Sequence, residues 1–541
     1  MTGAQDGPPP FEDIVALLSD PATHAADGPV EMHRTHAAIV FLVGRDAYKV
    51  KRPVRYDYLD FSTPEKRRAM LRHEFDLNAS AAPGIYLGLV AVTRDADGRL
   101  ALDGDGEPVE WCLHMRRFPQ GAELSAVAAR GALTTRLAED IGTTVADLHA
   151  RAEPRAEDGQ ALVRDIATEL DGAFAGMTDI LPAGDIARFN DLVAARVDAT
   201  GALLATRGRA GHVRRGHGDL HMGNMVVLDG RPVPFDALEF DERLGTLDVL
   251  YDLAFLLMDM LHRGLDNAAN AVLGAWLRRM DDVAHLDGLA ALPLFLGLRA
   301  GIRAMVSVQS ARMEGEDAAA KTREARGYLA QALDHLDPPA PRLVAVGGFS
   351  GTGKTTLARH LAPGIGAAPG AVHLRSDIER KTLYGVDPLT ALPPEAYSAE
   401  ASERVYSVLR DKAMRLLLAG HSAVLDAVFD RQDERDRVRE LAERAGVPMT
   451  GLWLTAREEV LVERVSSRSG DASDADAAVV RQQLETGDTA RGWTAIDAGG
   501  PASATLEQAR AATGAQRPDI GHAGDEDAET TESGGGTRNS P

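Results

Sequence analysis

Apolar and polar positions follow a strand-like pattern near the beginning of the chain and a helical pattern over most of its middle. Short apolar runs bounded by turn residues predict strands at residues 37–43, 47–54, 86–93 and 109–115, and a helical pattern covers residues 64–78. From about residue 124 to residue 335 the pattern is mainly helical, with a loop and hairpin between residues 217 and 241. We therefore expect a small mixed lobe followed by a larger helical lobe.

A different pattern begins after a proline-rich connector. Residues 336–342 read LDPPAPR, and these prolines end the preceding helix and stiffen the chain. Short apolar runs follow at residues 343–347, 371–375 and 423–425. Such runs are typical of strands that are buried on both faces of a parallel sheet. We expect a three-layer α/β/α unit here.

These patterns divide the chain into domains. We expect an N-terminal extension (1–29), a first domain (30–335, with a small lobe at about 30–118 and a helical lobe at about 122–335), a linker (336–342), a second domain (343–498) and a disordered acidic tail (499–541). The length of 541 residues suits two or three domains, because one core stops growing near ~250 to 300 residues. The tail is expected to be disordered because its acidic residues lie among Gly, Ser and Thr.

Charge and composition narrow the range of partners. The formal net charge of -22 repels polyanions, so we expect a small neutral or cationic substrate and no extended nucleic acid. We expect no membrane span, because the most apolar helical stretch, residues 249–261, is interrupted by Asp252 and Asp259. A single cysteine, Cys112, and the absence of Lys and Arg before Arg34 favour a cytoplasmic location.

The octet GFSGTGKT, residues 348–355, matches the phosphate-binding loop GxxxxGK[ST] and directly follows an apolar run. In such a loop, backbone N–H groups and a helix N-terminus bind phosphates, while Lys354 reaches the β- and γ-phosphates and Thr355 ligates Mg²⁺. The expected nucleotide contacts are Gly348, Ser350, Gly351, Thr352, Gly353, Lys354, Thr355 and Thr356.

Two aspartates follow the neighbouring apolar runs. Asp426 ends the run at 423–425, where we expect it to hold Mg²⁺ together with Thr355. Asp377 follows the run at 371–375, and we expect it to act as the base for a substrate hydroxyl, with Arg380 facing the same pocket one helical turn later. The alternative is a helix cap beside a surface arginine.

Two arginines precede the acidic stretch DASDADAAVV, residues 471–480. Arg464 and Arg468 share a helical face. Near a mobile flap, such a pair could neutralise charge on the transferred phosphoryl group. An ordinary face with salt bridges is the alternative.

A second octet, HGDLHMGN at residues 217–224, has the D-x-x-x-x-N spacing of kinase catalytic loops. In this spacing Asp219 orients or deprotonates the acceptor hydroxyl, and Asn224 holds Mg²⁺. The hairpin that follows turns at an Asp-Gly pair, and its strict pairing brings Asp236 beside Asn224 as a second metal ligand. We expect Asp252 to accept hydrogen bonds from the loop and fix its shape.

Histidines in the same octet have a simpler expected role. We expect His217 and His221 to structure the loop rather than to bind zinc, because the sequence has no further His or Cys cluster to complete a zinc shell.

The octet HGDLHMGN, the segment FDALEF (235–240) and the segment DVLYDLA (248–254) resemble the catalytic loop, metal-binding segment and following helix of the aminoglycoside phosphotransferase and choline kinase group. The resemblance implies a bilobal, protein-kinase-like fold that uses ATP. It also implies that Lys49 or Lys51 contacts the ATP phosphates and that Glu74 pairs with that lysine. Both lysines face the same side of one strand, so both stay open, and we favour Lys49. Residues 30–50 lack a GxGxxG loop, so binding without catalysis also stays open for this domain.

The P-loop and the segment SDIER (376–380) resemble the small P-loop kinases that include zeta-toxin-like, gluconate-kinase-like and polynucleotide-kinase-like enzymes. This implies phosphate transfer from Mg-ATP to a hydroxyl. The order of both halves across about residues 30–495 resembles a bacterial family of fused aminoglycoside-phosphotransferase-like and P-loop ATP-binding proteins.

We therefore expect an ATP-dependent phosphotransferase with two nucleotide-type sites, the cofactors ATP and Mg²⁺, and a small-molecule hydroxyl as acceptor. The alternative is an ATP-switched regulatory protein whose kinase-like domain binds a partner without chemistry. A toxin-like sugar-nucleotide kinase is a narrower option.

Overall fold

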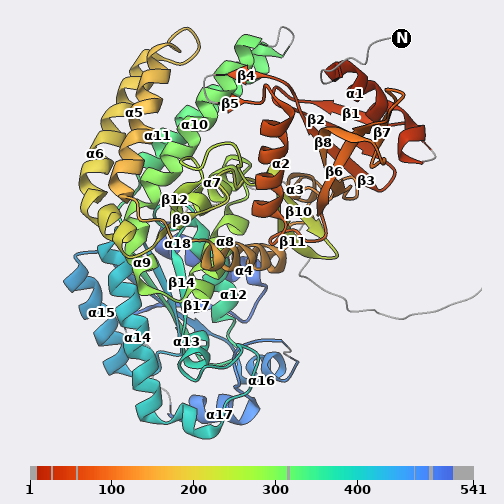
Figure 1. The fold of residues 1–541 in the computed structure, drawn as a ribbon. Coiled ribbons are helices and arrows are strands. Elements are labelled where there is room, and N and C mark those ends of the chain that lie inside the picture. Colours follow the sequence, from red (N-terminus) through yellow and green to blue (C-terminus); the bar gives the residue numbers. More distant parts are fainter. Residues whose placement is uncertain are drawn as a thin grey trace, which may run out of the picture.

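The computed structural model describes residues 9–25, 28–56, 59–313, 317–467, 470–486 and 492–515. Its N-terminal part holds a six-stranded antiparallel sheet in the order β1-β2-β3-β8-β6-β7 (Figure 1). The elements are α1 (Phe11–Ser19), η1 (Pro21–His24), β1 (Glu31–Arg34), β2 (Ala38–Val43), β3 (Asp46–Lys51), β4 (Arg55–Tyr56), β5 (Leu59–Asp60), α2 (Pro64–Asn78), β6 (Tyr86–Arg94), β7 (Leu100–Leu102) and β8 (Glu107–Arg116). The four expected strands are β2, β3, β6 and β8, and the expected helix is α2.

The two faces of this sheet are covered by different helices, because successive residues of a strand point to opposite sides. Val50 of β3 packs in one apolar cluster with Leu18 of α1. Its neighbours Lys49 and Lys51 therefore lie on the other face, where both contact α2. Within the expected N-terminal extension, residues 11–19 form α1, whose apolar side is buried against the sheet.

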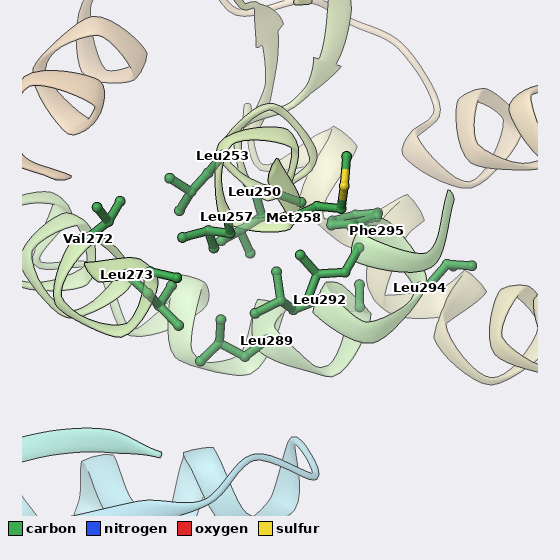
Figure 2. Close-up of a cluster of buried hydrophobic side chains, with 14 of the residues drawn as sticks. Leu250, Leu253, Leu257, Met258, Val272, Leu273, Leu289, Leu292, Leu294 and Phe295 are labelled. Carbon is green, nitrogen blue, oxygen red and sulfur yellow. The ribbon is translucent and has the colours of Figure 1, made fainter. Parts of the chain in front are cut away.

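The helical lobe follows the small sheet. Its elements are α3 (Leu124–Ala129), α4 (Thr135–Arg151), α5 (Gly159–Ala175), α6 (Ala183–Arg209), β9 (Val213–Arg215), η2 (Met222–Asn224), β10 (Met225–Leu228), β11 (Arg231–Pro234), β12 (Thr246–Asp248), α7 (Val249–His262), α8 (Asp266–Met280), α9 (Val283–Gly288), η3 (Leu289–Ala291), α10 (Leu292–Met313) and α11 (Ala318–Leu336). Figure 2 shows Leu253 and Leu257 of α7 in one buried cluster with Leu273, Leu289 and Leu292. The predicted small mixed lobe followed by a larger helical lobe is confirmed.

One stretch of this lobe is apolar enough for a membrane span by length and composition. It covers Val283–Met313, with a mean hydropathy of 1.6 over its best window, of which 72% is buried inside the protein. A core helix of a folded lobe can be as long and as apolar as a membrane span. Most of this stretch is α10, which packs against α7 and α11. The sequence analysis weighed only residues 249–261, the more apolar helix, and the structure adds this longer stretch as a second candidate by length.

The C-terminal part is built on a five-stranded parallel sheet in the order β14-β15-β13-β16-β17. Its elements are β13 (Leu343–Gly348), α12 (Lys354–Leu361), η4 (Ala362–Gly364), β14 (Val372–Arg375), α13 (Ser376–Leu383), η5 (Pro394–Tyr397), α14 (Ala399–Leu418), β15 (Ala423–Asp426), α15 (Gln432–Ala445), β16 (Met449–Thr455), α16 (Glu458–Ser467), α17 (Ala477–Thr486), β17 (Thr494–Asp497) and α18 (Ala502–Thr513). Side chains of α12 and α18 share a core with one face of the sheet, and those of α14 and α15 share a core with the other. The predicted three-layer arrangement is confirmed.

The expectation of disorder from residue 499 is wrong for its first part. Residues 502–513 form α18, which buries Ala509 against the sheet and α12. The alanine-rich stretch supplies an apolar side, and the acidic residues that motivated the expectation come later in the chain. The acidic residues lie at 516–541, outside the described part of the chain.

The helical lobe packs directly on the parallel sheet (Figure 1). Asn270 of α8 donates from Nδ2 to the carbonyl oxygens of Pro369, at 3.2 Å, and Ala371, at 3.0 Å, beside the edge strand β14. Arg415 of α14 pairs with Asp287 of α9 at 2.8 Å. The proline-rich connector therefore joins two parts that share an interface.

Candidate functional site

The P-loop leaves the central strand of the parallel sheet, β13, at its carboxyl end. In such sheets this edge lines the crevice where ligands bind. Gly351 has φ 86°, and a Cβ added there would lie 2.6 Å from the carbonyl oxygen of Leu461, so the close approach requires glycine. Lys354 begins α12 and donates from Nζ to the carbonyl oxygen of Phe349 at 3.1 Å. The other expected nucleotide contacts lie in the same loop or in the first turn of α12: Gly348, Ser350, Thr352, Gly353, Thr355 and Thr356.

The two residues expected to hold Mg²⁺ meet beside this loop. Thr355 donates from Oγ1 to Oδ2 of Asp426 at 2.7 Å. Burial by itself would raise the pKa of Asp426, but the hydrogen bond from His373 at 3.2 Å and the charges of Arg375 and Lys354 together outweigh it and hold the pKa at about 2. An ionised carboxylate next to a hydroxyl is a donor set that suits Mg²⁺.

Asp377 lies in the first turn of α13 and lines a cavity of about 380 Å³. Lys354 and Asp426 line the same cavity. Burial raises the pKa of Asp377, and the nearby Asp426 charge raises it further. A carboxylate with a raised pKa, facing a cavity beside a phosphate loop, is suited to accept a proton from a hydroxyl.

The expected arginines lie at the cavity where the structure describes them. Arg380 lines it, and its Nη1 donates to the carbonyl oxygen of Ala396 at 2.5 Å. Arg464 also lines it, and its Nη1 donates to the carbonyl oxygen of Ala498 at 2.9 Å. Arg468 lies outside the described residues. Both described guanidinium groups are thus held by protein carbonyls, and their contacts with phosphate stay predictions.

The sequence analysis missed two residues that line the same cavity, Asp474 and Gln483. Gln483 of α17 accepts a hydrogen bond at Oε1 from the backbone N–H of Ser350, at 2.8 Å. Asp474 accepts from Lys381 at 2.6 Å and from the hydroxyl of Tyr397. The acidic stretch DASDADAAVV was the only sequence signal for this side of the cavity. The groups that these two residues contact, in Ser350, Lys381 and Tyr397, lie far away in the chain.

The second candidate site lies where the hairpin β10–β11 approaches α7. Asp252 is fully buried and accepts hydrogen bonds from the backbone N–H groups of His217, at 2.7 Å, and Gly218, at 3.0 Å. This is the predicted contact with the catalytic loop. Nε2 of His149 also lies 3.2 Å from Asp252, and Trp276 donates to Nδ1 of the same ring at 3.0 Å. The proton of His149 is therefore on Nε2.

The predicted catalytic and metal-binding residues come together in this loop. Asn224 donates from Nδ2 to Oδ2 of Asp219 at 2.9 Å. The backbone N–H of Phe235 donates to the carbonyl oxygen of Asn224 at 3.0 Å, so the hairpin has the expected register. Asp236 follows at once, with φ 59°, a left-handed conformation that non-glycine residues seldom adopt outside functional sites and turns.

Both histidines of the octet make loop contacts, as expected. His221 accepts at Nδ1 from the backbone N–H of Gly223 at 3.0 Å, and its Nε2 lies 3.5 Å from Asp219. His217 donates from Nε2 to the carbonyl oxygen of Phe235 at 2.9 Å. Burial alone would raise the pKa of Asp219, but the hydrogen bond from His221 and the nearby His217 and Arg299 together outweigh it and lower the pKa. The aspartate is thus held in its ionised form.

Lys49 and Lys51 differ in their partners, which the sequence alone could not show. Lys49 pairs with Glu74 at 2.7 Å and with Asp236 at 3.0 Å, whereas Lys51 pairs with the other oxygen of Glu74 at 2.7 Å and with Glu239. Burial would lower the pKa of Lys49, but Asp236 and Glu74 outweigh it and raise the pKa. Lys49 is therefore the lysine that reaches the predicted metal carboxylate.

Arg299 of α10 is a further residue near the catalytic loop that the sequence analysis missed. Its guanidinium lies 3.9 Å from the ring centre of Tyr251 and 4.7 Å from that of Phe255. The Phe255 ring in turn contacts His221, at 5.3 Å between ring centres. Among the described residues, Nη2 of Arg299 has no hydrogen-bond partner. A buried cation thus lies behind the loop that carries Asp219.

Comparison with known proteins gives matches to both parts. A family model described as an AAA domain matches residues 343–488. The uncharacterized protein Rv2004c from Mycobacterium tuberculosis is 31% identical over 492 residues, which cover 89% of this chain and 94% of that protein. A gluconokinase structure from Sinorhizobium meliloti 1021 is 23% identical and covers 32% of this chain and 92% of its own, with a TM-score of 0.24. A choline/ethanolamine kinase family structure from Mesorhizobium loti is 15% identical and covers 60% of this chain and 98% of its own, with a TM-score of 0.36.

Proposed function

This chain belongs to the same family as the uncharacterized Mycobacterium tuberculosis protein that it matches over 89% of its length, and from the geometry of its P-loop site we propose that it is an ATP-dependent phosphotransferase. In this proposal the P-loop part transfers phosphate from Mg-ATP to a hydroxyl group of a small molecule. The observation that carries the proposal is the cavity of about 380 Å³ that Lys354, Asp377 and Asp426 line together.

Each of these residues has a chemical role in the proposal. Mg-ATP, when bound, supplies the phosphoryl group. Lys354 and the backbone N–H groups of the P-loop orient the phosphates. Thr355 and Asp426, which lie 2.7 Å apart, hold the metal ion. Asp377 accepts the proton of the attacking hydroxyl at its carboxylate, and α17 shields the cavity from water.

The N-terminal part is proposed as a second phosphotransferase-type site. Its support is the contact between Asn224 and Asp219, and the position of Lys49 between Glu74 and Asp236. Asp219 would orient the acceptor hydroxyl, and Asn224 and Asp236 would hold the metal ion.

An ATP-switched regulatory protein is the alternative function. The observation in its favour is the interface between α8 and the edge of the parallel sheet, through which a change at one site could bias the other part. The two functions differ in one respect, because only the phosphotransferase yields a phosphorylated product.

The test is ATP consumption over a pool of hydroxyl-bearing metabolites, with the products identified by mass spectrometry. The intact chain is compared with Asp219→Asn, Lys354→Ala and Asp377→Asn. Lys354→Ala removes a charged hydrogen-bond donor worth about 1.5–3 kcal/mol, so we expect ATP to bind the P-loop roughly 10- to 100-fold more weakly. If neither aspartate variant alters turnover while Lys354→Ala still weakens nucleotide binding, the regulatory function is correct instead.

Gln483→Ala is expected to tighten ATP binding. The backbone N–H of Ser350 donates to Gln483 at 2.8 Å, so the glutamine oxygen competes with phosphate for this donor. One neutral hydrogen bond is worth about 0.5–1.5 kcal/mol, which corresponds to a roughly two- to tenfold lower Kd for ATP. Isothermal titration calorimetry measures this, with exposed Gln482→Ala as the matched control. A higher Kd in Gln483→Ala alone would contradict the competition.

A further inference from the structure

Two histidines that are far apart in the sequence meet beside an aspartate in the helical lobe. His212 lies just before β9, His285 lies in α9, and Asp282 caps the N-terminus of α9. One ligand atom from each lies within 4.8 Å of the others. The two imidazole rings are 4.8 Å apart between centres and inclined by 65°. Sequence patterns did not indicate this cluster, because its members belong to no common motif.

His285 carries an independent sign that a ligand belongs here. The residue is 1% exposed, and its Nδ1 is buried without a hydrogen-bond partner among the described residues. Leaving a buried polar atom unpaired costs about 1–3 kcal/mol, so a native structure that keeps one needs a reason. Burial lowers the pKa of both His212 and His285, so both rings are neutral and have the lone pair that metal ions bind.

The charges around the cluster allow a cation despite a nearby arginine. Arg207 is fixed by Asp248, with Nε 2.7 Å and Nη2 2.8 Å from the two carboxylate oxygens, and its Nη1 donates to the carbonyl oxygen of Ala284 at 2.8 Å. Its charge is thus offset by a partner of opposite sign. Asp282 uses Oδ1 to cap the backbone N–H of Ala284 at 2.9 Å and keeps Oδ2 for a ligand.

We propose that His212, Asp282 and His285 bind a divalent transition metal ion of the zinc type. Two imidazoles and one carboxylate form a common protein ligand set for Zn²⁺, with water in the fourth position. Bond lengths of about 2.0–2.2 Å require the ligand atoms to come closer together, and Asp282 is the exposed member of the cluster. The ion would fasten α9 to the start of β9.

The position of the site suggests what the ion would do. α9 contacts α14 of the P-loop part through the ion pair between Asp287 and Arg415, at 2.8 Å. On the other side, the backbone N–H of Val249, the first residue of α7, donates to the carbonyl oxygen of His212 at 3.1 Å. The ion would therefore stiffen the region between the α7 N-terminus and the interface with the P-loop part.

The test uses the full chain in excess Mg²⁺, which would fill the proposed sites at Asp219 and Asp426. Calorimetry with Zn²⁺ and the visible absorption of Co²⁺ report binding, and thermal unfolding reports stabilisation by the metal ion. We expect one equivalent of Zn²⁺ to bind the intact chain. We expect His285→Ala to lose affinity by at least about 100-fold, since even the loss of a residue that only orients a metal ligand costs 10- to 100-fold.

Two further variants keep the test decisive. Asp282→Asn preserves the helix cap, because Asn caps as well as Asp, and we expect it to weaken Zn²⁺ binding without loss of folding. His335→Ala is the control, since His335 is also buried with an unpartnered ring nitrogen but belongs to no cluster of metal-ligating residues that the structure describes. The proposal is overturned if the intact chain binds no stoichiometric Zn²⁺. It is also overturned if His285→Ala and Asp282→Asn bind Zn²⁺ as tightly as the intact chain does.

Discussion

Asp377→Asn is expected to lower turnover at the P-loop site by roughly 10²- to 10⁴-fold, the range that general base catalysis contributes. Asp377 lines the cavity that Lys354 and Asp426 also line, and asparagine keeps the size of the side chain while it removes the proton acceptor. The binding of ATP should change little, because the phosphates are held by the loop. Steady-state kinetics with the identified acceptor measure kcat, and nucleotide titration measures binding.

The pH dependence gives a second signature of the same residue. Burial and the Asp426 charge raise the pKa of Asp377 above the ordinary value of about 3.9. A base acts in its deprotonated form, so kcat/KM should fall as the pH drops through this raised pKa, and the fall should be absent from the residual activity of Asp377→Asn. Asp411→Asn, an exposed aspartate of α14, is the control. An unchanged kcat in Asp377→Asn would leave this residue as a helix-terminal carboxylate without a role in proton transfer.

The sequence predicted local elements well where one pattern determines them. Residues 64–78 combine a threonine cap, a proline in the first turn and a helical period, and the structure places α2 at Pro64–Asn78. The hairpin at β10–β11 also has the expected register, because the Asp-Gly turn fixes it: Asp229 and Gly230 have φ 50° and 74°. The N-terminal helix α1 and the C-terminal helix α18 were missed, since their burial depends on distant parts of the sheets.

In the candidate sites too, residues within one motif were predicted, whereas contacts between distant motifs were not. The P-loop residues lie in one octet, so their spacing alone predicted their position. Lys49 and Lys51 differ only in their distant partners, Asp236 and Glu239, which no local pattern could assign. The contact of Gln483 with the loop was missed for the same reason. Tertiary contacts between residues of separate motifs are what a single sequence leaves open.

Asp252→Ala is expected to destabilise the helical lobe by about 3–5 kcal/mol, the cost of breaking a buried charge network. The carboxylate accepts from the backbone N–H groups of His217, at 2.7 Å, and Gly218, at 3.0 Å, and lies 3.2 Å from Nε2 of His149. Alanine leaves these donors buried and unpaired. Activity at the Asp219 site should be lost as well, because the two N–H groups fix the catalytic loop. Denaturant unfolding followed by circular dichroism measures the stability.

The effect should depend on pH in a definite direction. Burial would raise the pKa of Asp252, but the hydrogen bond from His149 and the nearby His217 and Arg299 together outweigh it and hold the pKa well below its ordinary value. A carboxyl group with a lowered pKa stabilises the fold fully above the unfolded-state pKa of about 3.9 and loses this contribution as the pH falls below that value. The stability difference between the intact chain and Asp252→Ala should therefore be largest near neutral pH and shrink on acidification. Asp334 is an exposed aspartate of α11, and the control variant Asp334→Ala should show no such difference. If Asp252→Ala and Asp334→Ala were equally stable at neutral pH, the loop would keep its shape without Asp252.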